Sequence, residues 1–277
     1  MVSGDDVLGS LGRATSWELV DSVAVKGDVG HPQGLCRWGE GWLVGTVHPA
    51  SARGEVVVVS ADGEVLRRVD VTDGERLHPG GFTWDLPSSA TSGPPGCWIA
   101  VAEYRPRSTT TVMRLDADLV VVESFPFDDH LGAICALADG TLFAMSWASR
   151  RWYRLDAAGH ILDQRTTPSR WVDLQDITHV TAGSGGERVV ANGVGGLLAP
   201  TGQVQLGGLV VIDVDALTIE HDTPVAAWMP SGRVATYNGA HLDLDDGPLV
   251  TLHCLVDDIA ASIGTWTASS VSPRRVV

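Results

Sequence analysis

The feature that most constrains the fold is a repeated pair of β-hairpins. Four stretches of similar form, at residues 56–69, 112–125, 152–165 and 209–222, each contain two apolar runs around a short turn. Their turns centre on Asp62, Ala117, Ala157 and Val214. Another pair of apolar runs precedes each stretch. Because short β-branched runs between Gly, Asp and Pro turns favour strands, and helical periodicity is almost absent, we expect an all-β protein.

Each unit of this repeat therefore contains four strands. The units open near His31, His78, His130 and Gln175, so about 45 to 52 residues separate successive units, which is the spacing of propeller blades. A fifth unit after residue 225 contains only three strands, and residues 16–25 supply the missing outer strand. We predict a five-bladed β-propeller, closed by the N-terminal strand in the last blade so that no sheet edge stays open there. A six-bladed ring is the alternative.

The whole chain, residues 1–277, is predicted to form this single domain. The expected blades cover residues 30–75, 76–127, 128–168, 169–224, and 225–272 together with 16–25. Two segments rich in Gly, Pro or Ser, 86–96 and 193–207, are interpreted as loop insertions. A chain of 277 residues with 44% hydrophobic residues is long enough to bury a full core.

The amino-acid composition limits the classes of partner that the protein is expected to bind. The formal net charge is -15 and no basic cluster is visible, which argues against a nucleic-acid or anionic membrane surface. The acidic N-terminus and the absence of an apolar run of about 18 residues predict a cytoplasmic protein. The four cysteines form no C-x-x-C pair and are expected to be reduced core thiols. A small-molecule substrate is the expected partner, and the oligomeric state is left open.

One imidazole recurs at the same register of three units. The motifs are HPQG at 31–34, HPGG at 78–81 and HLGA at 130–133. The innermost strand of each propeller blade begins at one end of the central channel, and the second strand returns to that end. His31, His78 and His130 are therefore expected to meet at one channel mouth.

Three imidazoles at one mouth predict a divalent metal site. Neutral imidazole is a favoured ligand for transition metals, and the ion could be Zn, Fe, Mn, Ni, Mg or Ca. The candidates for completing the ligand set are Gln175, Asp176 and His241. The alternative is a channel plugged by polar side chains that hydrogen-bond to one another.

Other polar side chains are expected at the same mouth because they end second strands. The candidates for catalysis are Tyr104, Glu103 and Arg105. Tyr104 is the candidate acid or base, because a phenol near a cation loses its proton more readily, and Arg105 could hold an anionic group. A simple Glu103–Arg105 ion pair is the alternative. The candidates for substrate binding are Trp147, Arg150, Arg151 and His48, since Trp and Arg can clamp a flat molecule.

Two other chemistries are not expected. The glycine run at 193–196 is not followed by a strand-to-helix transition, so no nucleotide cofactor is predicted. The sequence around Ser184 lacks the G-x-S-x-G spacing of a serine hydrolase.

The His-Pro-x-Gly motif, followed by an apolar strand, an Asp-Gly or Glu-Gly turn and a second apolar strand, resembles blades of the streptogramin (virginiamycin B) lyase family. The gluconolactonase and strictosidine-synthase propellers belong to the same wider group. In the lyase family, channel histidines and a carboxylate bind a divalent cation that promotes a ring-opening elimination. The resemblance implies that His31, His78 and His130 bind such a cation, whereas no residue here can be equated with the carboxylate.

Two further resemblances concern the number of blades. Gln33-Gly34-Leu35 is similar to a segment of the five-bladed glutamine cyclotransferases, although their flanking motif is missing. The chain also resembles an uncharacterised group of bacterial propellers.

The leading hypothesis is a divalent-metal-dependent enzyme that acts on a small molecule at the channel mouth. The expected reaction is proton abstraction followed by elimination, cyclisation or isomerisation, as in a lyase. A lactonase-type metal hydrolase is the second hypothesis. The third is a non-catalytic propeller that binds a ligand or docks a protein.

Overall fold

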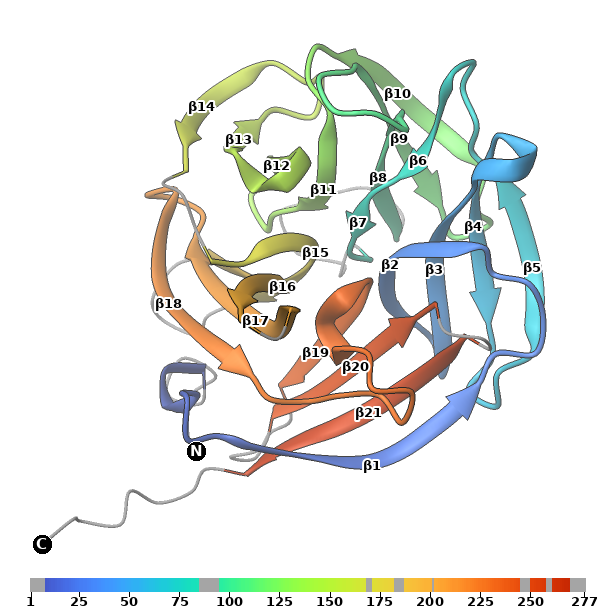
Figure 1. Ribbon diagram of the computed structural model, residues 1–277. Helices are drawn as coiled ribbons and strands as arrows, with labels where there is room; N and C mark the ends of the chain where they lie inside the picture. The colour runs from blue at the N-terminus through green and yellow to red at the C-terminus, as the bar shows by residue number, and fades with distance from the viewer. Residues whose placement is uncertain are drawn as a thin grey trace, which may run out of the picture.

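The computed structural model describes residues 8–84, 95–167, 171–181, 187–200, 202–244, 250–257 and 261–269. The strands in these ranges form five sheets arranged around a central axis (Figure 1). The protein is therefore a nearly all-β, five-bladed propeller, as the sequence predicts. The six-bladed alternative is wrong.

Each of the first four blades runs from an inner strand to an outer strand in chain order. The first sheet contains β2 (His31–Trp38), β3 (Gly41–His48), β4 (Arg53–Val59) and β5 (Val65–Asp70). The second contains β6 (Arg76–Pro79), β8 (Gly96–Glu103), β9 (Thr110–Asp116) and β10 (Val121–Phe127). The third contains β11 (Leu131–Ala136), β12 (Leu142–Ser146), β13 (Arg151–Leu155) and β14 (Ile161–Thr166), and the short β7 (Gly81–Phe82) pairs in parallel with β11. The fourth contains β15 (Asp173–Thr181), β16 (Glu187–Ala199), β17 (Gly202–Asp213) and β18 (Thr218–Val225).

The fifth blade joins the two ends of the chain. It contains β19 (Ala240–Leu244), β20 (Val250–Val256), β21 (Ser262–Ser269) and, as its outer strand, β1 (Ser16–Ala24). β1 runs antiparallel to β21, with Ser16 opposite Ser269 and Ala24 opposite Ser262. Figure 1 shows β1 along the outside of this blade. The predicted closure of the ring by the N-terminal strand is confirmed.

The core is divided into five clusters, one between each pair of neighbouring blades. The strand β8 illustrates the cause, because alternate side chains of a strand point to opposite faces of its sheet. Ile99 and Val101 pack against the first blade, while Trp98 and Ala100 pack against the third. Both faces of a blade are thus buried, which explains why middle strands such as β3 and β8 are nearly continuous apolar runs.

Glycines in the blade-opening motifs let the inner strands approach one another at the narrow axis. A Cβ atom on Gly81 would collide with the carboxylate of Asp176, which belongs to a blade across the axis. A Cβ atom on Gly239 would collide with the backbone of Gly34. Glycine is needed at such close contacts because it has no side chain.

The segment 193–207 differs from the expected loop insertion. It belongs to a long hairpin in which β16 and β17 pair without a break from Arg188 opposite Asp213 to Ala199 opposite Gly202. Gly195 is a strand residue, and a Cβ atom on it would collide with Trp171. This glycine therefore makes room for that tryptophan. The other expected insertion, 86–96, lies mostly outside the described residues.

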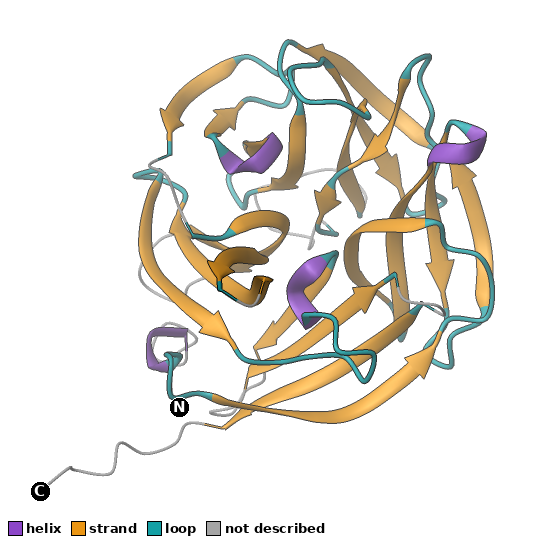
Figure 2. Cartoon of the chain, in the orientation of Figure 1, coloured by secondary structure: helices purple, strands orange, loops and turns teal. Residues whose placement is uncertain are grey.

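Three short 3-10 helices follow strand ends: η1 (Pro49–Ser51), η2 (Trp147–Ser149) and η3 (Ala235–Tyr237). In Figure 2, η3 lies beside the centre of the ring and η1 lies at its outer edge. No helix in the described ranges is long and apolar enough to cross a membrane. All four cysteines are buried.

Candidate functional site

A cavity of about 260 Å³ lies at the mouth of the channel where the inner strands begin. All five blades contribute to its wall. The residues that line it are His31, Gln33, His78, Tyr104, Gly132, Trp147, Ala148, Asp173, Leu174, Gln175, Val194, Gln205, Tyr237 and Asn238. The structure thus brings together five of the predicted site residues: His31, His78, Tyr104, Trp147 and Gln175.

His31 forms a close pair with a carboxylate of the fifth blade. Its Nδ1 lies 2.5 Å from Oδ2 of Asp257, and the other oxygen of Asp257 lies 3.2 Å from the Arg233 guanidinium. Arg233 also lies 4.8 Å from the centre of the Tyr237 ring. Because the carboxylate accepts from Nδ1–H, the other nitrogen of His31, Nε2, is left with a lone pair. A histidine held in this way can accept a proton.

His78 is a neutral histidine in the cavity wall. Its Nε2 donates to Oε1 of Gln33 at 3.0 Å. Only 5% of the residue is exposed. Desolvation lowers its pKa from 6.5 to about 3, and His130 and His31 act in the same direction. Its Nδ1 is buried and has no hydrogen-bond partner among the described residues.

His130 lies behind the wall rather than in it. It is fully buried, with its ring centre 5.4 Å from that of His78 and 4.4 Å from that of Trp147. Its Nδ1 donates to the carbonyl oxygen of Arg105 at 2.8 Å and lies 3.0 Å from the Ser108 hydroxyl. Desolvation lowers its pKa, and its buried Nε2 has no partner in the described part of the chain.

Tyr104 reaches the cavity, whereas its two neighbours do not line it. The Tyr104 ring is 45% exposed and its centre lies 5.1 Å from that of His78. Glu103 accepts from Arg105 Nε at 2.6 Å and from the Thr109 hydroxyl at 3.2 Å. Desolvation acts to raise the pKa of Glu103, but the bonds from Arg105 and Thr109 together outweigh it and lower that pKa. The expected alternative, an ion pair that stiffens the loop, matches this geometry.

Asp173 is a cavity residue that sequence reasoning missed. It opens β15, the inner strand of the fourth blade, two residues before Gln175. Desolvation raises the pKa of its carboxyl, and Arg150 opposes this effect without cancelling it. Asp173 could have been predicted from its position, because it stands at the start of an inner strand, as the three histidines do in other blades. Gln33, Gln205 and Tyr237 were missed as well.

Asp176 lies deeper, at the axis of the ring. It is fully buried, and its oxygens accept from the backbone N–H groups of Leu35 at 2.8 Å, Ile177 at 2.8 Å and Ala240 at 3.1 Å. Burial raises its pKa well above the usual range, against the effect of these bonds. Asp176 thus ties together the inner strands of the first, fourth and fifth blades.

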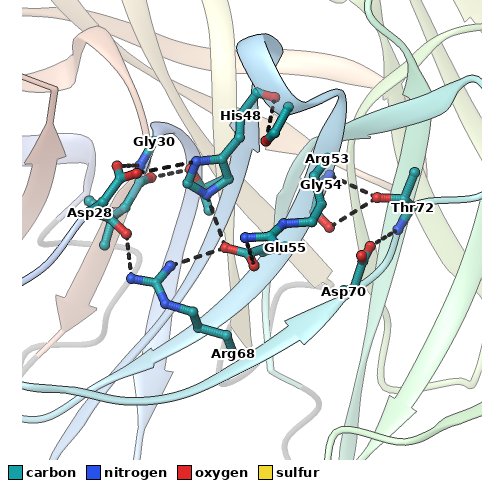
Figure 3. Close-up of polar contacts among 12 residues, drawn as sticks. Asp28, Gly30, His48, Arg53, Gly54, Glu55, Arg68, Asp70 and Thr72 are labelled. Atoms are coloured by element: carbon teal, nitrogen blue, oxygen red, sulfur yellow. Dashed lines mark hydrogen bonds and ion pairs between the residues drawn. The ribbon is translucent and has the colours of Figure 1, made fainter.

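His48 lies at the end of β3, away from the cavity residues. Figure 3 shows its ring between Asp28 and Glu55. Its Nε2 lies 2.9 Å from Glu55, which is 3% exposed and also pairs with Arg53 and Arg68 at 2.7 and 3.0 Å. His48 therefore contacts a buried carboxylate within the first blade.

Three more predicted residues are not among those that line the cavity. Arg150 and Arg151 are exposed, and Arg151 lies 3.5 Å from Asp129. His241 lies 3.1 Å from Asp243, which also pairs with His253 at 3.1 Å and Arg37 at 3.0 Å. This second cluster joins the fifth blade to the first.

The donor set for a metal is incomplete in this arrangement. Within the described ranges, no three His, Cys, Asp or Glu side chains are grouped so that they could hold one ion. The two unpartnered nitrogens, Nδ1 of His78 and Nε2 of His130, are suitable donors, but catalytic zinc sites use three protein ligands. The metal requirement therefore stays a prediction.

Comparison with models of protein families shows which family the sequence belongs to. Residues 6–271 match the profile of a family described as "Family of unknown function (DUF6454)". The chain belongs to this family. No curated protein matches its sequence.

Solved structures show that the DUF6454 chain shares its fold with other propellers. The tail fibre of a Staphylococcus aureus phage is 9% identical, with a TM-score of 0.52 over 93% of this chain and 53% of that one. A catalytically inactive virginiamycin B lyase from Staphylococcus aureus, solved with quinupristin, is 12% identical, with a TM-score of 0.47 over 91% and 99%. The WD40 domain of Toxoplasma gondii coronin is 9% identical, with a TM-score of 0.45 over 96% and 89%. The lyase is thus among the propellers that resemble this chain, as the sequence predicts, and such distant likeness concerns the fold alone.

Proposed function

We propose that this protein is an enzyme that moves a proton on a small molecule bound in the channel-mouth cavity. The observation that carries the proposal is the 2.5 Å contact between His31, which lines the cavity, and Asp257, which lies behind the wall. A general base needs an acceptor nitrogen that faces the substrate and a partner that fixes its tautomer. His31 meets both needs, because Asp257 accepts from Nδ1–H and leaves Nε2 to take the proton.

The proposed reaction begins when His31 Nε2 removes a proton from a carbon atom of the substrate. The electron pair left on that carbon expels a leaving group, attacks within the molecule or moves to a neighbouring carbonyl, which gives elimination, cyclisation or isomerisation. The charge on the protonated imidazole is balanced by Asp257. Arg233 keeps Asp257 in place from its other side.

A proton donor is also needed where negative charge appears. Asp173 suits this role, because desolvation raises its pKa and favours the protonated carboxyl. Tyr104, the expected acid or base, is the second donor and lies across the cavity beside His78. Neutral His78 does not compete with His31 for the proton, because its pKa lies near 3.

A divalent metal ion remains part of the leading hypothesis. If one binds, His78 and His130 would hold it through their unpartnered nitrogens, and it would supply Lewis acidity. Metal analysis of the purified protein tests this directly. Content well below one equivalent, with no gain after reconstitution with Zn, Mn, Fe, Ni, Mg or Ca, would remove the metal from the proposal and leave proton transfer by His31 untouched.

The lactonase-type hydrolase and the non-catalytic propeller are the two other hypotheses, and each predicts a different outcome. If His31 removes a proton from water, the enzyme is a hydrolase of the lactonase type, and product formed in ¹⁸O-water carries the label. A non-catalytic propeller would bind a ligand without changing it.

The test is a turnover screen. A pool of cellular small molecules is incubated with wild type, His31→Ala and His160→Ala, and changes in mass are followed by mass spectrometry. His160 is the control because it is an exposed histidine that pairs with Asp156 in a hairpin turn. We expect a compound that wild type and the control convert and that His31→Ala does not. Equal conversion by all three proteins, or none by wild type, would overturn the proposal.

A further inference from the structure

The cavity that holds His31 is unusual in the polar groups that it presents. Among the described residues that line it there is no Lys or Arg, and Asp173 is the one acidic residue. Arg233 is engaged by Asp257 behind the wall. Binding sites for phosphates and carboxylates use Lys or Arg as charge partners, and Arg binds carboxylate through a planar fork. An anionic ligand would find no such partner in this wall.

Two buried acceptor atoms in the wall lack donors. One is Nδ1 of His78, and the other is Oδ1 of Asn238, a side chain that is 2% exposed. The remaining polar atoms of both side chains are engaged: His78 Nε2 with Gln33 and Asn238 Nδ2 with the carbonyl of Pro32 at 3.0 Å. Both unpartnered atoms are acceptors: Oδ1 of Asn238 is an amide oxygen, and the bond that His78 Nε2–H donates to Gln33 leaves the imidazole lone pair on Nδ1.

A buried polar atom without a partner lowers stability, and a ligand that supplies the missing donor recovers this free energy as affinity. The same atoms reject a ligand that brings another acceptor. The rest of the wall suits a small polar molecule with a ring. Trp147 and Tyr237 offer aromatic faces, and Gln175 and Gln205 offer amides that both donate and accept. The volume of about 260 Å³ is slightly below the range of about 300 to 1,000 Å³ that is typical of drug-sized ligands.

We infer that the substrate class of this site is a small molecule without negative charge that donates at least two hydrogen bonds through O–H or N–H groups. One group donates to His78 Nδ1 and one to Asn238 Oδ1. The inference rests on the proposed function for the idea that the bound molecule reacts, but it concerns binding and is tested without turnover.

The test uses ligand-observed NMR with a set of compounds that share a six-membered ring. Glucose and myo-inositol are the neutral donors, glucosamine is the cationic donor, glucuronate is the anion, and fully O-methylated glucose is the ring without donors. We expect the neutral or cationic donors to bind, and glucuronate and the methylated sugar to bind at least tenfold more weakly. Preferred binding of glucuronate, equal binding of the methylated sugar, or binding of none of the five would overturn the inference.

The wild-type protein supplies a second readout. In ¹⁵N-histidine spectra, His78 should be the Nε2–H tautomer, and the Nδ1 resonance should move upfield when the binding compound is added. His78→Phe should weaken binding by about tenfold, the cost of one lost hydrogen bond, while the exposed control His160→Phe should not. An Nδ1 resonance that does not respond to a bound compound would show that water alone partners this atom, and would contradict the inference. If the compounds bind as expected but nothing is converted in the turnover screen, the proposed function fails and the ligand class stands.

Discussion

At the scale of single residues, the surroundings of a histidine in the fold determine its chemistry more than the motif in which it stands. His31 and His78 open neighbouring blades in the same motif, yet one is held by a carboxylate and the other by an amide. His78 is also the more deeply buried of the two, and this desolvation lowers its pKa and keeps it neutral. The equivalence of the motifs in the sequence therefore hides two different chemical roles.

The neutral state of His78 makes stability depend on pH. Its pKa is about 3 in the folded protein, against 6.5 when exposed, so between these values the unfolded chain binds a proton that the folded chain does not. Stability is then lost as the pH falls through 6.5, by about 2 kcal/mol at pH 5. Urea unfolding at pH 7 and pH 5 should show this loss in wild type. In His78→Gln the loss should be smaller by about that amount, while the contribution of His130 stays. Equal losses in the two proteins would contradict the assignment.

Asp176 gives a prediction about the axis of the ring. Asp176→Ala leaves three buried backbone N–H groups without their acceptor, and each such loss costs about 1 to 3 kcal/mol. The melting temperature should therefore fall steeply. Asp176→Asn keeps one acceptor oxygen and the shape of the side chain, so its loss should be smaller. An unchanged melting temperature for Asp176→Ala would show that these bonds do not hold the inner strands together.

At the scale of elements, the β16–β17 hairpin connects fold and site. Its inner part belongs to the fourth blade, and its outer part carries Val194 and Gln205 to the cavity. A hairpin beyond the blade can change in sequence without disturbing the core. It is therefore the element that we expect to adjust which molecule the cavity accepts.

Two glutamines on this hairpin offer a matched test. Gln205 lines the cavity, whereas Gln203, two residues away on the same strand, does not. Gln205→Ala should weaken binding of the compound found by NMR by about tenfold, the cost of one hydrogen bond, with an unchanged melting temperature. Gln203→Ala should leave both quantities unchanged. Equal effects of the two substitutions on binding would mean that the hairpin acts through its backbone alone.

The sequence predicts features that depend on residues close together in the chain, and it does not predict contacts between residues that are far apart in it. Blade openings such as His31 and His78 are visible because strand, turn and motif lie within a few residues. Asp257 follows the second strand of the last blade, so its register places it at the predicted channel mouth. Its pairing with His31 is not visible in this way, because 226 positions separate the two residues and only ring closure brings them together. His48 and His241 share the register of the site residues, but Glu55 and Asp243, close to them in the chain, already bind them. Register predicts which end of the channel a side chain lies near, and local partners decide whether it faces the cavity.

At the scale of the whole molecule, ring closure determines the site. Asp257 and Asn238 belong to the last blade, and they reach His31 and the carbonyl oxygen of Pro32 in the first blade only when the ring is closed. β1 completes that last blade as its outer strand. Loss of β1 would expose the edge of β21 and loosen the blade that carries Asp257.

Deletion of residues 1–26 should therefore lower the melting temperature and favour aggregation through the open edge. The matched control is a permuted chain in which residues 16–26 follow residue 269 through a short turn. This is feasible because Ser16 lies opposite Ser269. The control lacks the buried Leu8 and Leu11, so it should melt below wild type but well above the deletion variant. A deletion variant that melts like wild type would contradict closure of the ring by β1.

The central claim is that His31, oriented by Asp257, transfers a proton in the cavity. The most direct measurement is kcat of Asp257→Asn for the compound identified in the turnover screen, with the melting temperature measured in parallel. General base catalysis contributes about 10² to 10⁴-fold, so we expect kcat to fall within this range while the fold is retained and KM changes little. An Asp257→Asn protein that is folded and turns over at the wild-type rate would contradict the account.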